Sequence, residues 1–488
     1  MIIAPPPRAA TGIDGLDDVL NGGLIPDRLY LLEGRPGTGK TTLGFQFLLD
    51  GVRQGESVMY VTLSETQEEI RAVAASHGWS LDGVAIRELI SATGTLDGED
   101  EYTVFHPSEV ELGDTTRRML EDVERAQPSR LVLDSLSELR LLAGTALRYR
   151  RQILGLKQFF AGRRCTVLML DDLTSAPHDL QVQSIAHGAV MLELQIATFG
   201  AVRRRLSVTK YRGSEFRGGY HDYQIRRGGI EVYPRLVAAE HRQQSSRERL
   251  RSGIDALDAL LGGGLERGSS TLIQGAAGTG KSTIAALFAA QAAERGEHSA
   301  LFLFEESTNT LFERMEGFGI DLHRYVASGL VRIRQVDPAE VSPGELAHEV
   351  RQCVEADDAR LVVFDSLNGF LNSMPDETAL IVHLHELMSY LGQLGVATVL
   401  IGAHQGILGT AMNGPVDASY IADAVLLLRY FEADGEVNQA ISVVKMRGGD
   451  HERTLREFTM KAGRISIGEP LRHFRGVLTG VPERQSPP

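Results

Sequence analysis

The sequence predicts an α/β fold with two domains in tandem, each a mainly parallel sheet flanked by helices with an antiparallel extension at its C-terminal end. Three observations lead to this prediction. A glycine-rich, lysine-containing loop occurs twice, the motifs around it recur at a fixed spacing, and short apolar runs alternate with helical patterns. With 43% apolar and 23% charged residues, the 488-residue chain has the composition of a globular protein.

Both loops have the pattern of a phosphate-binding loop. Residues 34–41 read Gly-Arg-Pro-Gly-Thr-Gly-Lys-Thr, and residues 275–282 read Gly-Ala-Ala-Gly-Thr-Gly-Lys-Ser. In this motif backbone N–H groups surround a polyphosphate, the lysine reaches the outer phosphates, and the final hydroxyl coordinates Mg²⁺. Each loop lies between an apolar run and a helical pattern, so two matches favour nucleotide binding over coincidental turns. The expected phosphate-binding residues are Gly34, Gly37, Thr38, Gly39, Lys40, Thr41, Thr42, Gly275, Gly278, Thr279, Gly280, Lys281, Ser282 and Thr283.

The loops belong to a longer internal repeat. The motif Thr-Gly-Ile-Asp-Gly-Leu-Asp at 11–17 returns, with conservative changes, at 252–258, an offset of 241 residues. The offset falls to 231 between Asp134 and Asp365, so we expect ten additional residues in the first repeat, around 92–109. Duplication of a whole domain explains this pattern.

The repeat predicts the domain organisation. We expect one domain at residues 1–236 and a second at 252–488, which ends in a short tail. The polar stretch at 237–251 is the expected linker.

Apolar runs separated by helical patterns indicate a parallel sheet that is covered on both faces. In the first repeat the expected order is strand 57–62, helix 66–77, strand 130–134, helix 149–161 and strand 166–170. Antiparallel segments follow at 189–209 and 220–232, and the second repeat ends in the same way at 424–430 and 440–445.

One carboxylate ends an apolar strand in each repeat. Asp134 and Asp365 are expected to meet the metal ion that the hydroxyls of Thr41 and Ser282 hold. The alternative is that each aspartate only caps the helix that follows its strand.

A second strand of the second repeat ends in Glu305 and Glu306, a pair that could polarise an attacking water or hydroxyl beside the γ-phosphate. The first repeat has Ser64 and Glu65 at these positions. If the first carboxylate of the pair is the stronger base, hydrolysis in the first repeat is expected to be slow. Glu65 is a candidate catalytic residue, with a plain role beside a helix N-terminus as the alternative.

The composition limits the classes of partner. With 50 basic and 64 acidic side chains the net charge is −14, which argues against broad attraction to nucleic acid. The cluster Arg203-Arg204-Arg205 is more typical of a solvated face than of a nucleic-acid site. The two cysteines exclude a disulfide framework, and no apolar run is long enough to cross a bilayer, so we expect a cytoplasmic protein without membrane partners.

The order of these motifs, twice in one chain, resembles the KaiC family of RecA-like ATPases. Besides the phosphate loops, the resemblance rests on the motif at 11–17, Glu305-Glu306, the Asp-Ser-Leu after each strand-ending aspartate, and Lys-Met-Arg-Gly at 445–448. It extends over nearly the whole chain. The resemblance implies two tandem RecA-like domains, ATP and Mg²⁺ as cofactors, and a double-ringed homohexamer with nucleotide between subunits.

The resemblance also implies roles for individual residues. It implies that four basic side chains reach the phosphates bound by a neighbouring subunit. From sequence alone they would be solvated charges on a strand. The four are Lys210, Arg212, Lys445 and Arg447. Ser419 falls on a serine that clock members phosphorylate, but Tyr420 replaces the adjacent threonine, so a one-site autokinase is expected. The first repeat keeps only Ser184 at the matching position.

A final pair concerns γ-phosphate sensing. His404-Gln405 follows an apolar strand where RecA-like proteins often place a sensing glutamine. In the first repeat we take Asp171-Asp172 as the equivalent pair, so that sensor is missing.

These observations favour a hexameric ATPase that autophosphorylates on serine and acts, with an unknown partner, in signalling or timing. Two alternatives remain open. One is a RecA-like nucleic-acid motor, and the other is an ATP-gated scaffold with little turnover.

Overall fold

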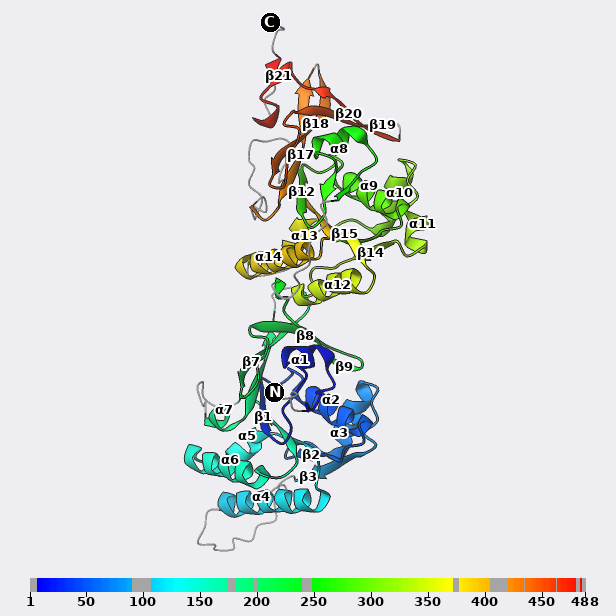
Figure 1. Cartoon of the computed structure of the whole chain (residues 1–488). Helices are drawn as coiled ribbons and strands as arrows, with labels where there is room; N and C mark the ends of the chain where they lie inside the picture. Colours follow the sequence, from blue (N-terminus) through cyan, green and yellow to red (C-terminus); the bar gives the residue numbers. More distant parts are fainter. Residues whose placement is uncertain are drawn as a thin grey trace, which may run out of the picture. The chain divides into compact units, whose positions relative to one another are not determined.

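The structure, a computed structural model, describes residues 7–89, 107–173, 181–196, 200–238, 248–371, 377–403, 420–433, 435–461, 463–479 and 483–484. The chain divides into two compact units, which we call unit 1 (Met1–Arg235) and unit 2 (Leu236–Pro488). Figure 1 shows that each is built from one large sheet with helices on both faces.

The sheet of unit 1 has nine strands in the order β3-β2-β4-β5-β1-β6-β7-β8-β9. Neighbours from β3 to β6 run parallel, and those from β6 to β9 run antiparallel. The predicted mainly parallel sheet with an antiparallel extension is therefore confirmed. The strands are β1 (Leu29–Gly34), β2 (Val58–Thr62), β3 (Val84–Glu88), β4 (Arg130–Asp134), β5 (Thr166–Asp171), β6 (Gly188–Gln195), β7 (Arg203–Tyr211), β8 (Tyr220–Arg226) and β9 (Gly229–Tyr233).

Side chains that alternate along the central strands bury both faces of this sheet. Tyr60 of β2 stacks on Phe45 on one face, while Met59 and Val61 join the core of the other face. The first face is covered by α1 (Asp14–Val19), α2 (Lys40–Arg53) and α3 (Gln67–Ser76). The second is covered by α4 (Pro107–Ala126), α5 (Leu136–Ala143), α6 (Ala146–Phe160) and the short α7 (Gln181–Ile185).

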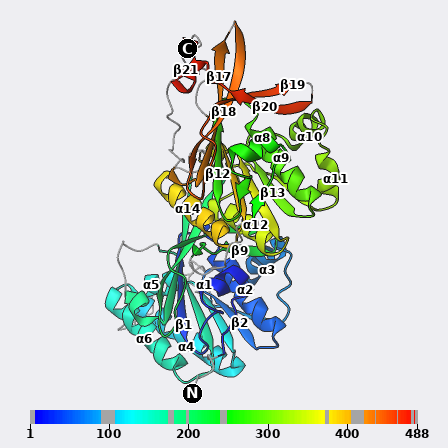
Figure 2. The same ribbon diagram turned by 45° about the horizontal axis from the view of Figure 1, so that its top comes forward.

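Unit 2 repeats the topology in the order β14-β13-β15-β16-β12-β17-β18-β19-β20. In Figure 2 its long β17–β18 hairpin projects beyond the helices. The strands of this sheet are β12 (Ser270–Gly275), β13 (His298–Leu303), β14 (Val331–Gln335), β15 (Ala359–Asp365), β16 (Ala397–Ala403), β17 (Ala424–Ala433), β18 (Glu436–Met446), β19 (Arg456–Lys461) and β20 (Arg464–Pro470).

The helices of unit 2 also form two layers. One face carries α8 (Asp255–Leu260), α9 (Lys281–Glu294), α10 (Thr308–Glu316) and α11 (Leu322–Ala327). The other carries α12 (Pro343–Glu355), α13 (Leu367–Leu371) and α14 (Glu377–Gln393). Beyond the sheet lie β21 (Phe474–Arg475), η3 (Val477–Thr479) and β22 (Glu483–Arg484).

The difference of ten residues between the repeats is a net value. Unit 2 has α11 before β14, and the offset from Val84 to Val331 is 331 − 84 = 247 residues. At β4 and β15 the offset is 361 − 130 = 231, between Arg130 and Leu361. Unit 1 therefore gains sixteen residues between β3 and β4, and residues 90–106 between these two strands lie outside the described part.

Part of the expected linker has regular structure. Leu236 and Ala238 are buried in the core of unit 2. At the other end of the linker, β10 (Arg249–Leu250) pairs with β11 (Leu265–Glu266). Residues 239–247 lie outside the described part of the chain.

Both cysteines, Cys165 and Cys353, are buried free thiols. Among the described residues no helix combines the length and the apolar character that crossing a bilayer requires.

Candidate functional site

Each phosphate loop connects the end of a central strand to the start of a buried helix. Gly39 and Gly280 immediately precede α2 and α9, with left-handed φ angles of 89° and 94°. A Cβ on Gly39 would lie 2.6 Å from Cδ1 of Ile225, and one on Gly280 would lie 2.6 Å from Sδ of Met460. Backbone conformation and close packing therefore both require glycine at this position.

The loop lysines are buried and point back across their own loops. Lys40 Nζ donates to the Gly34 carbonyl at 2.8 Å, and Lys281 Nζ donates to the Ala276 carbonyl at 2.8 Å. Burial lowers the pKa of Lys281, while the nearby Asp365 and Glu305 oppose that shift. Each ammonium group thus lies over the concave side of its loop, where an anionic phosphate would replace carbonyl contacts.

Each loop hydroxyl meets the strand-ending carboxylate. Thr41 Oγ1 donates to Asp134 Oδ2 at 2.9 Å, and the Ser282 side chain hydrogen-bonds to Asp365. Burial raises the pKa of both carboxyl groups, which a cation would reverse. Among the described residues no cluster of three or more His, Cys, Asp or Glu forms a metal site. A hydroxyl and a carboxylate nevertheless suit Mg²⁺, which takes its remaining ligands from water and phosphate oxygens.

In unit 2 the two expected catalytic glutamates have different contacts. Glu305 Oε1 accepts a hydrogen bond of 2.9 Å from Ser366 Oγ, directly after Asp365. Glu306 is held by both terminal nitrogens of Arg314, one at 2.8 Å. The Arg314 guanidinium neutralises Glu306, whereas Glu305 lies near enough to Lys281 of the phosphate loop to act on it electrostatically.

Unit 1 has a different set of groups at this place. Ser64 is exposed, and Oε2 of Glu65 is buried with no hydrogen-bond partner among the described residues. Val73 occupies the position of Arg314, because the two helices are related by the 241-residue offset. Burial, followed by the nearby charge of Asp134, raises the pKa of Glu65.

The remaining loop residues are placed as follows. Thr38 and Thr279 are fully buried, and their hydroxyls donate to loop carbonyls at 2.7 and 2.8 Å. Thr42 and Thr283 are buried in the first turn of the helix, where Thr42 Oγ1 lies 3.5 Å from His77 Nε2.

The four basic residues predicted to act in trans lie elsewhere. Lys210 pairs with Ala189 near the beginning of β6, whereas the phosphate loop follows the end of β1. Its ammonium group donates to the carbonyls of Gln183 and Ser184, and Arg212 also donates to Ser184. In unit 2, Lys445 donates to Ala422 at 2.7 Å and Arg447 donates to Tyr420 at 2.8 Å.

The candidate phosphorylation site, Ser419, lies outside the described residues, as do His404 and Gln405. The expected equivalence of Asp171-Asp172 with His404-Gln405 is wrong by two residues. Asp171 pairs with Glu33 and Gly402 pairs with Gln274, which are equivalent positions of β1 and β12. Asp172 therefore corresponds to Ala403.

Sequence reasoning missed the contact of Asp172 with the phosphate loop. Asp172 Oδ1 forms an ion pair of 2.8 Å with Lys40 Nζ. Burial would raise the pKa of Asp172, but hydrogen bonds from Lys40 and Ser137 hold it below its ordinary value. The acidic residue after a strand was a visible signal, but its partner is 132 positions away in the sequence.

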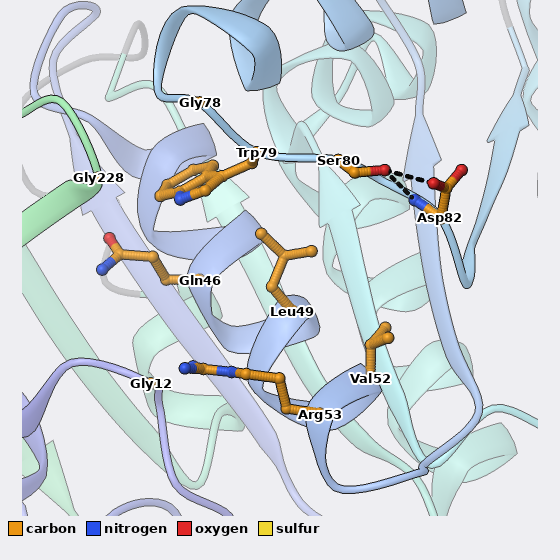
Figure 3. Close-up of a pocket in the computed structure, with 10 residues that line it drawn as sticks. All are labelled: Gly12, Gln46, Leu49, Val52, Arg53, Gly78, Trp79, Ser80, Asp82 and Gly228. Carbon is orange, nitrogen blue, oxygen red and sulfur yellow. Dashed lines mark hydrogen bonds between the residues drawn. The ribbon is translucent and has the colours of Figure 1, made fainter.

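A hollow of about 430 Å³ lies beside α2, away from its phosphate-binding end. Figure 3 shows Trp79, Gln46 and Arg53 around it. The amide of Gln46 donates to the Ile230 carbonyl and accepts from the Ile230 N–H. The hollow is lined by both apolar side chains (Leu49, Val52 and Trp79) and polar ones (Arg53, Ser80 and Asp82).

Glu33, at the end of β1, gives unit 1 a pH-dependent stability. Burial raises its pKa to about 7, while a hydrogen bond from Gln183 opposes this shift. A carboxyl group whose pKa is raised in the folded state makes the free energy of unfolding larger at low pH than at high pH. This contribution is lost as the pH rises through the folded-state pKa of about 7. We expect Glu33→Gln, which reproduces Gln274 of unit 2, to stabilise unit 1 by about 3 kcal/mol at pH 8 and by less than about 1 kcal/mol at pH 5.

Urea unfolding followed by the fluorescence of Trp79, the single tryptophan, measures this effect in unit 1. The exposed Glu68→Gln is the matched control and should change stability by less than about 0.5 kcal/mol at either pH. Equal gains from Glu33→Gln at both pH values would contradict the explanation.

Comparison with known proteins identifies the family of the chain. The family described as "ATPase: KaiC" matches residues 9–237 and 250–472. "Circadian clock protein KaiC3" of Synechocystis sp. is 28% identical over 97% of this chain and 94% of its own length. "Circadian clock oscillator protein KaiC" of Parathermosynechococcus lividus is 27% identical over 98% of this chain and 88% of its own length. Since the family match covers both units, the chain belongs to the KaiC family of ATPases.

Proposed function

We propose that this protein binds and hydrolyses Mg-ATP in both units and transfers phosphate to one of its own serines in unit 2. One observation carries the proposal. In each unit a loop hydroxyl contacts a strand-ending carboxylate beside a buried lysine, as in Thr41–Asp134 and Ser282–Asp365. These are the groups that a Mg-polyphosphate needs.

Glu305 is the proposed general base of unit 2. Its carboxylate is anchored by Ser366 and lies close enough to Lys281 to influence the pKa of that lysine. A group in this place can take a proton from water in hydrolysis or from a serine hydroxyl in phosphate transfer. Glu306 is proposed to hold α10 through Arg314.

A ring of identical subunits would bring the basic residues of one copy to the phosphate loop of the next copy. Lys210 and Arg212 lie at the end of the sheet where β1 and β6 begin. The loop that contains Lys40 lies at the opposite end, where β1 finishes. These two surfaces do not meet within one unit, and we propose that they meet between different copies in a head-to-tail contact. A contact of this kind closes a ring where the rotation between copies allows it, and the hexamer that the family resemblance implies is such a ring.

The basic run in β7 supports a signalling ATPase over a nucleic-acid motor. Arg205 is paired with Glu193 at 2.7 Å and lies 3.9 Å above the ring of Tyr220. Arg205 is therefore paired within the protein, and Glu193 neutralises a positive charge that binding to a phosphate backbone would need.

Mass spectrometry after incubation with Mg-ATP tests the proposal. We expect native spectra to show six copies, and intact spectra to show one added phosphate per chain, which peptide mapping assigns to Ser419. The control Lys281→Ala should carry no phosphate, since it lacks the ammonium group that contacts the outer phosphates. Phosphate on another residue, or equal phosphate in the control, would refute the autokinase, and a monomer with ATP bound would refute the ring.

A further inference from the structure

The serine after each strand-ending aspartate is hydrogen-bonded to a carboxylate in both units, but that carboxylate comes from different strands. In unit 2, Ser366 Oγ donates to Glu305, which follows β13. In unit 1, Ser135 and Ser137 are in contact, and Ser137 Oγ donates to Asp172 Oδ2 at 2.7 Å. Asp172 follows β5 and is also hydrogen-bonded to Ser135.

The topology makes both arrangements possible. In unit 1, β4 lies between β2 and β5, and in unit 2, β15 lies between β13 and β16. A side chain at the end of either flanking strand can therefore reach the serine that follows the middle strand. The structurally equivalent positions are Ser64 with Glu305, and Asp172 with Ala403.

The two units thus use these positions in opposite ways. Unit 2 has an acid after β13 and alanine as the last residue of β16, while unit 1 has serine after β2 and an acid after β5. Each acid is also close to the loop lysine of its own unit. Asp172 is paired with Lys40 at 2.8 Å, and Glu305 acts electrostatically on Lys281.

We propose that Asp172 is the water-activating carboxylate of unit 1 and takes the role proposed above for Glu305 in unit 2, so this inference rests on the proposed ATPase activity. In the step, the water oxygen forms a bond to the γ-phosphorus and gives a proton to the Asp172 carboxylate. The bond from that phosphorus to the β,γ-bridging oxygen breaks, and ADP leaves with its electron pair.

Two features of Asp172 fit this role. Its side chain is 29% exposed, so water can reach the carboxylate. The hydrogen bond that Asp172 accepts from Ser137 does not involve Lys40. When Lys40 turns from Asp172 to a bound triphosphate, the serine still holds the carboxylate, which is then free to accept a proton.

Relocating the carboxylate tests the inference. In a Lys281→Ala background, which silences unit 2, we expect Asp172→Asn to lower kcat about 100-fold with KM changed less than about threefold. The double variant Ser64→Glu/Asp172→Ala reproduces the arrangement of unit 2 and should recover kcat to within about tenfold of the parent. Trp79 fluorescence in urea checks that each variant keeps the unfolding midpoint of unit 1.

The other outcomes have separate meanings. Tighter ATP binding with undiminished kcat in Asp172→Asn would overturn the inference, because Asp172 would then only hinder nucleotide entry. A double variant as slow as Asp172→Asn would also overturn it. Loss of kcat in Glu65→Gln but not in Asp172→Asn would assign the base to Glu65. A parent that binds ATP without turnover would refute the proposed activity of unit 1 itself.

Discussion

Replacing Glu305 with glutamine is expected to slow ATP hydrolysis by unit 2 about 1,000-fold, within the range for loss of a general base. Glutamine keeps the size of the side chain and can still accept the 2.9 Å hydrogen bond from Ser366. It cannot take up a proton from the attacking water. The binding groups around Lys281, Ser282 and Asp365 remain, so the KM for ATP should change less than about threefold.

Phosphate release at saturating ATP measures this effect in a Lys40→Ala background, in which only unit 2 turns over. Glu306→Gln is the matched control, because Glu306 is an adjacent glutamate that already pairs with Arg314. We expect its kcat to fall less than about tenfold, and this loss should come from a less firmly held α10. If Glu306→Gln is the slower variant, the assignment of the base in unit 2 is wrong.

The fold could be predicted from sequence because its signals are local. The apolar run 130–134 needs only its own residues to be read as a buried strand, and the structure confirms β4 over the same residues. The helix expected at 66–77 is α3, and its N-terminus is marked by the capping box of Thr66 and Glu69. Repetition of both patterns in one chain then fixes the tandem α/β arrangement.

The candidate site could be predicted only in part. The phosphate loops are contiguous motifs, whereas the surroundings of the carboxylates depend on which strands are neighbours. Asp172 reaches Lys40 because β5 lies next to β1, and no spacing rule in the sequence encodes that pairing. The Arg314–Glu306 pair joins a helix to the segment that follows the preceding strand. In the sequence alone, Arg314 cannot be distinguished from an ordinary exposed charge.

The two units also differ away from the phosphate loops. Arg130, at the start of β4, is 1% exposed, and its guanidinium binds Glu56 and Asp50 as well as the carbonyls of Ala10 and Phe47. The equivalent residue in unit 2 is Leu361, which is fully buried in an apolar core. The same place in the fold is thus filled by an ion network in one unit and by hydrocarbon in the other.

Removing the arginine from this network is expected to destabilise unit 1 severely. Arg130→Ala leaves a cavity, takes the buried cation away from Glu56 and Asp50, and removes a donor from the carbonyls of Ala10 and Phe47. Breaking one side of a buried charge network in this way costs about 3–5 kcal/mol. The loss should appear as a lower urea midpoint in Trp79 fluorescence, since Trp79 packs against the core of unit 1.

The control variant separates charge from packing. Arg130→Leu/Asp50→Gln copies unit 2, where Leu361 and Gln291 occupy the equivalent positions, and it removes one of the stranded charges. Glu56 is 31% exposed and can turn to water, so we expect the double variant to lose less than half as much stability as Arg130→Ala. Equal losses would mean that the guanidinium acts through its hydrogen bonds to the Ala10 and Phe47 carbonyls, which no leucine can replace.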